Sequence, residues 1–221
     1  KLIFQTMRNL ILFISILLFF SCDSYNKMLK SAEPEVKLEA AFKYYEEGNY
    51  HRAMQLFENV IVSYRGTANA EKILFHYAYA YYKTGEYLTA AHHFSNLIKN
   101  LPNSQYAEES MYMSAYCKYL FAPEYYLDQT NTKNAIKEMQ LFINKYPNSE
   151  RINDANRIID ELRLKLETKN FESAKQFFKM REYKAAIITF QNLIKDYPGT
   201  IFTEEAYFMI IQSWFLYAEG S

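Results

Sequence analysis

The chain has 221 residues, with 25 basic and 25 acidic side chains and no formal net charge. A protein that binds nucleic acid through phosphate contacts needs a clustered positive surface, so this balance argues against a nucleic-acid partner. Aromatic residues make up 18% of the chain, with 21 Tyr and 17 Phe, which are too many for a solvated linker. Two cysteines exclude a framework of several disulfides.

The first residues have the parts of a bacterial secretion signal. Arg8 precedes an apolar run at residues 10–20 that only Ser15 interrupts, and Met7 is the expected start of translation. This run is too short for a helix that spans a bilayer, which takes about 20 residues. A basic flank followed by a short apolar core is typical of a peptide that is removed after export. We therefore assign residues 1–21 to a signal peptide.

The apolar run ends at a cysteine, and this junction resembles the lipobox of bacterial lipoproteins. Ser21 and Cys22 fit the pattern, whereas Phe19 and Phe20 stand where Leu and a small residue are usual. The resemblance implies that Cys22 receives a diacylglycerol on its thiol, becomes the first mature residue and is then acylated, commonly with palmitate. Two or three acyl chains give stable anchoring, since each buried methylene contributes about 0.8 kcal/mol. A plain signal peptide and an N-terminal anchor helix are the alternatives.

The mature chain would begin with a short linker. Without Lys1 and Arg8, which fall in the signal, 23 basic residues face 25 acidic ones and the net charge is −2. We assign residues 22–34 to a lipidated linker and residues 35–221 to a repeat domain whose last repeat looks truncated. If Cys22 carries lipid, Cys117 has no disulfide partner within the chain, and we expect it to be buried and inert.

Four copies of one pattern follow the linker. "YYEEGNYHRAMQLFENVIVSYRGT" at 44–67 and "YYKTGEYLTAAHHFSNLIKNLPNS" at 81–104 align without a gap at an offset of 37. The two later copies keep the small, large apolar and proline positions, at Ala135, Met139, Tyr146 and Pro147 and at Tyr183, Ala186, Phe190, Tyr197 and Pro198. Each copy reads as a helix, a short turn and a second helix, and a proline usually follows.

The spacing of these residues resembles the tetratricopeptide repeat. Ala53 and Ala90 would let two helices approach closely, with Phe57 and Phe94 filling the seam. The resemblance covers about residues 35–217. It implies an all-α fold, an α-solenoid of about five helix pairs whose first helices line a concave groove.

Two features depart from a uniform array. The third copy carries an insertion, "APEYYLDQTNT" at 122–132, between its two helices. The fourth copy has a first helix that should run uninterrupted over residues 153–180, longer than one repeat needs.

The sequence contains no catalytic constellation and no metal-binding pattern. His92 and His93 point about 100° apart on a helix, so they cannot share a face as ligands at i and i+4 do. Adjacent acids such as Glu46 and Glu47 diverge in the same way, and there is no phosphate-binding glycine loop or nucleophile elbow. We therefore predict a non-enzymatic protein with no cofactor except the covalent lipid on Cys22.

Aromatic residues recur at one register of the predicted first helices, in steps of three and four. The candidate peptide-binding groove consists of Phe42, Tyr45, Phe75, Tyr79, Tyr82, Tyr112, Tyr116 and Tyr119. Small residues at Ala41, Ala78 and Ala115 occupy the opposite stripe, where helix packing requires them. Rings with wide apolar faces suit an extended peptide rich in aromatic residues. Packing between helices is the alternative role for these rings.

The whole set of features resembles the BamD family of outer-membrane assembly lipoproteins, in the form seen in Bacteroidetes-like bacteria. The residues that carry this resemblance are the cysteine ahead of the repeats, the "YPNS" and "DYPGT" helix ends, and "YYLDQT" in the insertion. The resemblance implies a scaffold of the BAM complex, lipid-anchored in the outer membrane and facing the periplasm. Its partners would be the central barrel subunit, other assembly lipoproteins and unfolded outer-membrane protein precursors. The insertion would dock partners through Tyr125, Tyr126, Asp128, Gln129 and Thr130.

Two other functions fit the lipobox and the repeats. A periplasmic tetratricopeptide-repeat lipoprotein that organises cell-envelope or division proteins would not need "YYLDQT". An accessory subunit of a cell-wall enzyme is the third interpretation. Asp23 follows the cysteine directly, and in enterobacterial sorting an aspartate there favours the inner membrane, which leaves the choice of membrane open.

Overall fold

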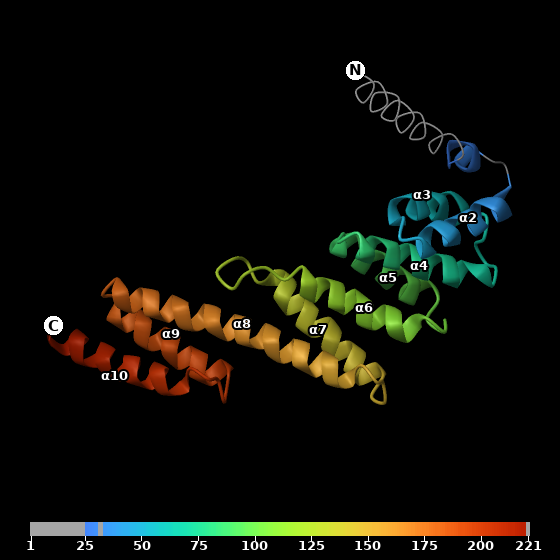
Figure 1. Ribbon diagram of the computed structural model, residues 1–221. Helices are drawn as coiled ribbons and strands as arrows, with labels where there is room; N and C mark the ends of the chain where they lie inside the picture. Colours follow the sequence, from blue (N-terminus) through green and yellow to red (C-terminus); the bar gives the residue numbers. More distant parts are fainter. Residues whose placement is uncertain (1–24, 31–32, 220–221) are drawn as a thin grey trace, which may run out of the picture. The chain divides into compact units, whose positions relative to one another are not determined.

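The computed structural model describes residues 25–30 and 33–219, and all regular secondary structure in these residues is helical. Packing divides the chain into two units, the first ending at Ala107 and the second beginning at Glu108. Within each unit, helices that follow one another in sequence lie side by side (Figure 1). The predicted all-α fold of repeated helix pairs is therefore confirmed.

The first unit contains two helix pairs. Its helices are α2 (Pro34–Glu46), α3 (Tyr50–Val60), α4 (Asn69–Lys83) and α5 (Tyr87–Asn100). Each packs on the next in sequence order. Ala53 and Ala90 are fully buried near the starts of α3 and α5, and Phe57 and Phe94 are fully buried one turn later. The predicted seam of a small residue followed by a large ring is confirmed in both pairs.

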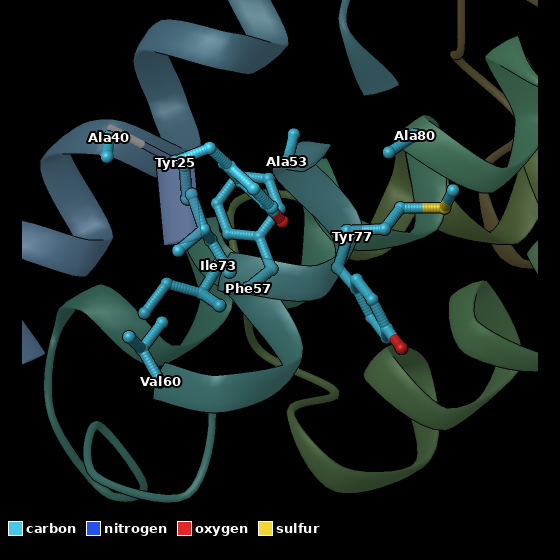
Figure 2. Close-up of a cluster of buried hydrophobic side chains, with 11 residues drawn as sticks. Tyr25, Ala40, Ala53, Phe57, Val60, Ile73, Tyr77 and Ala80 are labelled. Carbon is cyan, nitrogen blue, oxygen red and sulfur yellow. The ribbon is translucent and has the colours of Figure 1, made fainter. Parts of the chain in front are cut away.

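The first unit buries one hydrophobic cluster between α2, α3 and α4. Figure 2 shows Phe57, Val60 and Ile73 within it, and Tyr25, from the segment before α2, lies in the same cluster. Tyr25 belongs to the part of the chain that we predicted to be a linker, yet residues 25–30 are helical. The described end of this linker is therefore part of the folded first repeat.

The second unit contains the remaining helices and the insertion. Its helices are α6 (Ala107–Leu120), α7 (Thr130–Lys145), α8 (Ile152–Lys179), α9 (Tyr183–Asp196) and α10 (Thr203–Glu219). α8 matches the predicted long helix to within one residue at each end. It packs on α7 and on α9 (Figure 1). Its 28 residues rise about 42 Å, enough to serve two repeats.

A repeated ring stack shows which half of α8 corresponds to an ordinary first helix. Phe75 stacks on Tyr106 at 4.3 Å in the first unit. In the second unit, Phe171 stacks on Phe202 at 4.4 Å. Phe171 lies 96 residues after Phe75, and Phe202 lies 96 residues after Tyr106. The C-terminal half of α8 is therefore equivalent to α4, and its N-terminal half extends back along α7.

The turns between paired helices require a left-handed residue. Gly48 and Gly85 have φ of 76° and 81°, values that glycine adopts without steric cost. In the turn after α8 the same place is taken by Arg181, with φ of 62°. A left-handed non-glycine residue costs roughly 1–2 kcal/mol, so this turn carries strain that the first two do not.

Prolines follow three of the second helices, α5, α7 and α9. Leu101, Tyr146 and Tyr197 each precede a proline and leave the helical region, with φ between −134° and −126°. The proline ring disfavours the α conformation in the residue before it, so each helix stops there.

The insertion is shorter than predicted. α6 ends at Leu120 and α7 begins at Thr130, so the insertion loop comprises residues 121–129. Thr130 to Thr132, which we expected in the loop, form the first turn of α7, where Thr132 is fully buried. Across residues 25–30 and 33–219, no helix combines the length and apolarity needed to cross a bilayer.

Candidate functional site

The predicted groove residues of the first unit form an aromatic surface on α2 and α4. His76 of α4 lies at its centre, with its ring centroid 5.1 Å from Phe42, 5.0 Å from Tyr45 and 5.6 Å from Phe75. Its Nδ1–H donates to the carbonyl oxygen of Lys72 at 2.8 Å. Burial lowers the pKa of His76, so the ring is neutral near pH 7. α2 and α4 are therefore joined by packing around a neutral histidine.

Tyr79 and Tyr82 continue the aromatic surface along α4. Tyr79 meets Phe94 edge to face at 5.1 Å, and the Tyr82 ring lies 6.0 Å from both Tyr79 and Tyr87. All the predicted groove residues of this unit are half-buried. Each ring covers part of the core and keeps part of its surface accessible, which is the arrangement that a stacking site for an extended peptide needs.

Two of the predicted groove residues of the second unit, Tyr112 and Tyr119, are already engaged by charged side chains. Tyr112 is only 3% exposed, and its hydroxyl donates a hydrogen bond to Asp154. The Arg151 guanidinium lies 4.8 Å from its ring centroid, and the half-buried Tyr116 stacks on it at 5.7 Å. The Tyr112 ring is therefore not accessible to a peptide, and Tyr116 is the more exposed member of the pair.

A charged network joins α6 to α8 beside these rings. Arg157 donates to Asp154 at 2.5 and 3.1 Å and also to Glu161, which accepts the Tyr119 hydroxyl at 2.6 Å. Burial would raise the pKa of Asp154, but hydrogen bonds from Tyr112 and Arg157 outweigh it and lower that pKa. The Tyr119 hydrogen bond is the largest cause of the lowered pKa of Glu161. Both carboxylates stay ionised and hold the two tyrosine hydroxyls in place.

Aromatic periodicity did not identify this network, although the sequence carries a signal for it. The side-chain contacts between α6 and α8 join residues 42 apart, namely Glu109 with Arg151, Tyr112 with Asp154 and Tyr119 with Glu161. The guanidinium of Arg151 contacts both oxygens of Glu109, at 2.8 and 3.3 Å. A search for complementary polar pairs at one constant offset would have found these contacts.

The insertion loop has a fixed shape that Gln129 maintains. This side chain is 5% exposed. Its Nε2 donates to the carbonyl oxygens of Glu124, Tyr125 and Leu127 at 2.7, 3.3 and 3.0 Å. Its Oε1 accepts the hydroxyl of Thr132 at 2.7 Å. Gln129, predicted as a docking residue, therefore organises the loop from inside.

Neighbouring residues tie the loop to α7 and α8. Asp128 Oδ1 accepts the Thr130 backbone N–H at 3.0 Å, and hydrogen bonds from Thr130 lower the pKa of this carboxyl. Lys165 and Lys169 of α8 donate to loop carbonyl oxygens at 3.4 and 2.5 Å. The sequence "LDQT" thus encodes a loop held against α8, with Tyr125 and Tyr126 left on its surface.

A hollow of about 560 Å³ lies between the insertion loop and the C-terminal half of α8. Tyr126 is 66% exposed at its edge. The lining combines phenol rings with basic, acidic and amide side chains, from Tyr125, Tyr126, Lys169, Glu172, Ser173, Gln176, Lys179 and Met180. Such a mixture suits a polypeptide partner, because it offers an apolar seat together with hydrogen-bond donors and acceptors.

The side chains considered for chemistry are occupied in packing. Cys117 is fully buried, and burial raises the pKa of its thiol to about 12. His93 stacks on Tyr81 at 5.0 Å, and burial lowers its pKa. In the described part of the chain, no group of three or more His, Cys, Asp or Glu residues is placed to hold a metal ion.

The chain matches a known protein family over most of its length. A protein-family model described as "YfiO: Outer membrane lipoprotein" matches residues 31–217. The match begins nine residues after Cys22 and includes α2 to α9, most of α10 and the insertion loop. No curated protein matches the chain.

Proposed function

Because the chain belongs to the YfiO family of outer membrane lipoproteins, we propose that it is a non-enzymatic scaffold subunit of the β-barrel assembly machinery. It is anchored by lipid on Cys22, faces the periplasm, holds the central barrel subunit beside other assembly lipoproteins, and receives unfolded precursors. The observation that carries this proposal is the family match, which spans residues 31–217 and so includes the repeats and the insertion loop together.

Membrane attachment rests on the thiol of Cys22, which lies outside the described residues. Cys22→Ala should abolish uptake of labelled fatty acid and leave an uncleaved or mislocalised precursor. Cys117→Ala is the matched control, because Cys117 is buried and should leave labelling intact. Unchanged labelling of the Cys22→Ala protein would refute the lipid anchor.

Partner docking is assigned to the insertion loop and the hollow beside it. Tyr125 and Tyr126 supply the contact surface, whereas Asp128, Gln129 and Thr130 keep the loop in shape. A photoreactive amino acid at Tyr126 should cross-link to the central barrel subunit. The same probe at Ile188, which is also exposed (57% against 66% for Tyr126) but lies on α9, is the control. Equal cross-linking from the two positions, or none from Tyr126, would contradict docking at the loop.

Precursor binding is assigned to the aromatic surface of the first unit. Its rings are half-buried and partly accessible, and a chain rich in aromatic residues can lie across them. Tyr79 and Tyr82 are the residues expected to contact the precursor. In the second unit, the hydroxyls of Tyr112 and Tyr119 are bound to carboxylates, so Tyr116 is the ring of that unit most suited to contact a peptide.

A further inference from the structure

Tyr25 is locked into the first helix pair. It is 8% exposed and belongs to the buried cluster of the first unit (Figure 2). Its hydroxyl donates to Gln55 Oε1 at 2.5 Å and lies 3.3 Å from the carbonyl oxygen of Arg52. Its ring meets the Tyr44 ring edge to face at 5.5 Å. The side chain therefore contacts the end of α2 and the beginning of α3 at once.

Arg52 adds a cation to these contacts, and we call the set formed by Tyr25, Tyr44, Arg52 and Gln55 the clamp. The Arg52 guanidinium carbon lies 5.0 Å from the Tyr25 ring centroid and 5.5 Å from that of Tyr44, so one cation serves two aromatic rings. Met28 and Leu29, one turn further along, also pack against the cluster. The segment that begins at Tyr25 is thus fixed by ring packing, a cation and two polar contacts.

We infer that this clamp holds the first helix pair directly on the surface of the lipid bilayer. The inference rests on the proposed acylation of Cys22. Only three residue steps separate Cys22 from Tyr25, and an extended chain spans at most about 11 Å over three steps. The backbone of Tyr25 therefore lies within about 11 Å of the acylated cysteine, and the end of α2 and the start of α3 lie one side-chain contact beyond it, next to the headgroups.

A free linker would behave differently. If residues 22–34 were all extended, the lipid could lie about 45 Å from the domain. The clamp shortens the possible distance between the lipid and the domain, because only the residues before Tyr25 can still extend. It also determines which end of the first repeat faces the membrane. Lys27 and Lys30 are exposed on the clamped segment, where their charge favours anionic phospholipid headgroups.

Quenching by brominated phospholipids tests this placement. In a Trp214→Phe background, which removes the only native tryptophan, Glu47→Trp and Ser63→Trp put the reporter just before α3 and just after it. These positions are exposed and are separated by a helix of 11 residues, about 16 Å long. The mature chain is coupled through its Cys22 thiol to a maleimide lipid in vesicles that contain brominated phospholipid. Cys117 does not compete for the maleimide, because it is buried with a raised pKa.

We expect the Glu47→Trp reporter to be quenched several-fold more than the Ser63→Trp reporter. Tyr25→Ala should make the two signals converge, and Tyr25→Phe, which keeps the ring, should preserve most of the difference. Equal quenching in the parent chain, or a difference that Tyr25→Ala leaves unchanged, would overturn the inference.

An insertion variant covers the case in which Tyr25→Ala fails to fold. Ten Gly and Ser residues between Ser24 and Tyr25 leave the clamp intact but lengthen the tether, so the quenching difference should collapse while the helical circular-dichroism signal is retained. An unchanged difference would again overturn the inference. Chemical coupling makes this test independent of acylation in cells, which fatty-acid labelling of Cys22 measures separately. Failure of labelling would therefore count against the proposed function, and failure of the quenching result against the clamp.

Discussion

Replacing Gln129 with alanine should release the insertion loop, at a cost that the structure allows us to work out. The amide NH2 carries two hydrogens, so its contacts with three carbonyl oxygens amount to about two full hydrogen bonds. The bond from Thr132 adds a third. Each neutral hydrogen bond contributes about 0.5–1.5 kcal/mol, so the three together give about 1.5–4.5 kcal/mol. We expect Gln129→Ala to lower the free energy of unfolding by this amount.

Urea unfolding measures the loss, and hydrogen exchange of the loop amides locates it. Gln129→Glu keeps the size of the side chain and the acceptor for Thr132 but loses both donors, so it should cost at least as much. Tyr126→Ala is the surface control, because an exposed side chain usually changes stability by less than about 0.5 kcal/mol. If Gln129→Ala were as mild as Tyr126→Ala, Gln129 would not be what holds the loop.

Three further outcomes follow from the geometry. Arg181→Gly should raise the free energy of unfolding by about 0.5–1 kcal/mol in a urea titration, because φ is 62° there, and Gly85→Ala at φ of 81° should lower it. The pKa values of His76 and His93 are lowered in the folded chain, so the unfolded chain takes up protons at a higher pH than the folded chain does. The free energy of unfolding in urea should therefore fall as pH drops below 6.5, and a urea midpoint that does not change between pH 7 and pH 5 would contradict this. Tyr82→Ala should weaken the binding of an aromatic-rich precursor peptide in a fluorescence titration by about 1–2 kcal/mol, a modest hot-spot effect.

Phe57→Ala is the control for the Tyr82 variant. Phe57 is fully buried in the seam between α2 and α3, so its truncation should cost about 3–5 kcal/mol of stability. Peptide affinity per folded molecule should stay the same. If both variants destabilise equally and neither changes affinity, the aromatic surface only packs helices and does not bind peptide.

Periodicity was enough to predict the helices and their seams. Ala53 with Phe57 and Ala90 with Phe94 recur at a constant spacing, because a small residue allows the close approach and the ring fills it. The length of α8 followed from an uninterrupted apolar face. These features depend on a residue type at a helical position, which a sequence displays directly.

Features that depend on contacts between distant side chains were not predicted. Gln129 is polar and lies in a loop, so nothing in the sequence marks it as buried, and only its three carbonyl partners explain why it is. Arg181 occupies a left-handed position that a glycine pattern does not show. The aromatic register assigned Tyr112 to the candidate groove, but it could not show that the ring is buried, because the Asp154 carboxylate that accepts its hydroxyl lies 42 residues away in the sequence.

Affinity purification from detergent-solubilised outer membranes tests the central proposal most directly. A tagged chain with an intact Cys22 should recover the central barrel subunit in stoichiometric amounts, together with other assembly lipoproteins. The same chain carrying Cys22→Ala should recover less, because it is not delivered to the membrane. Recovery of division or cell-wall proteins without the barrel subunit would contradict the account and favour a periplasmic scaffold of the cell envelope.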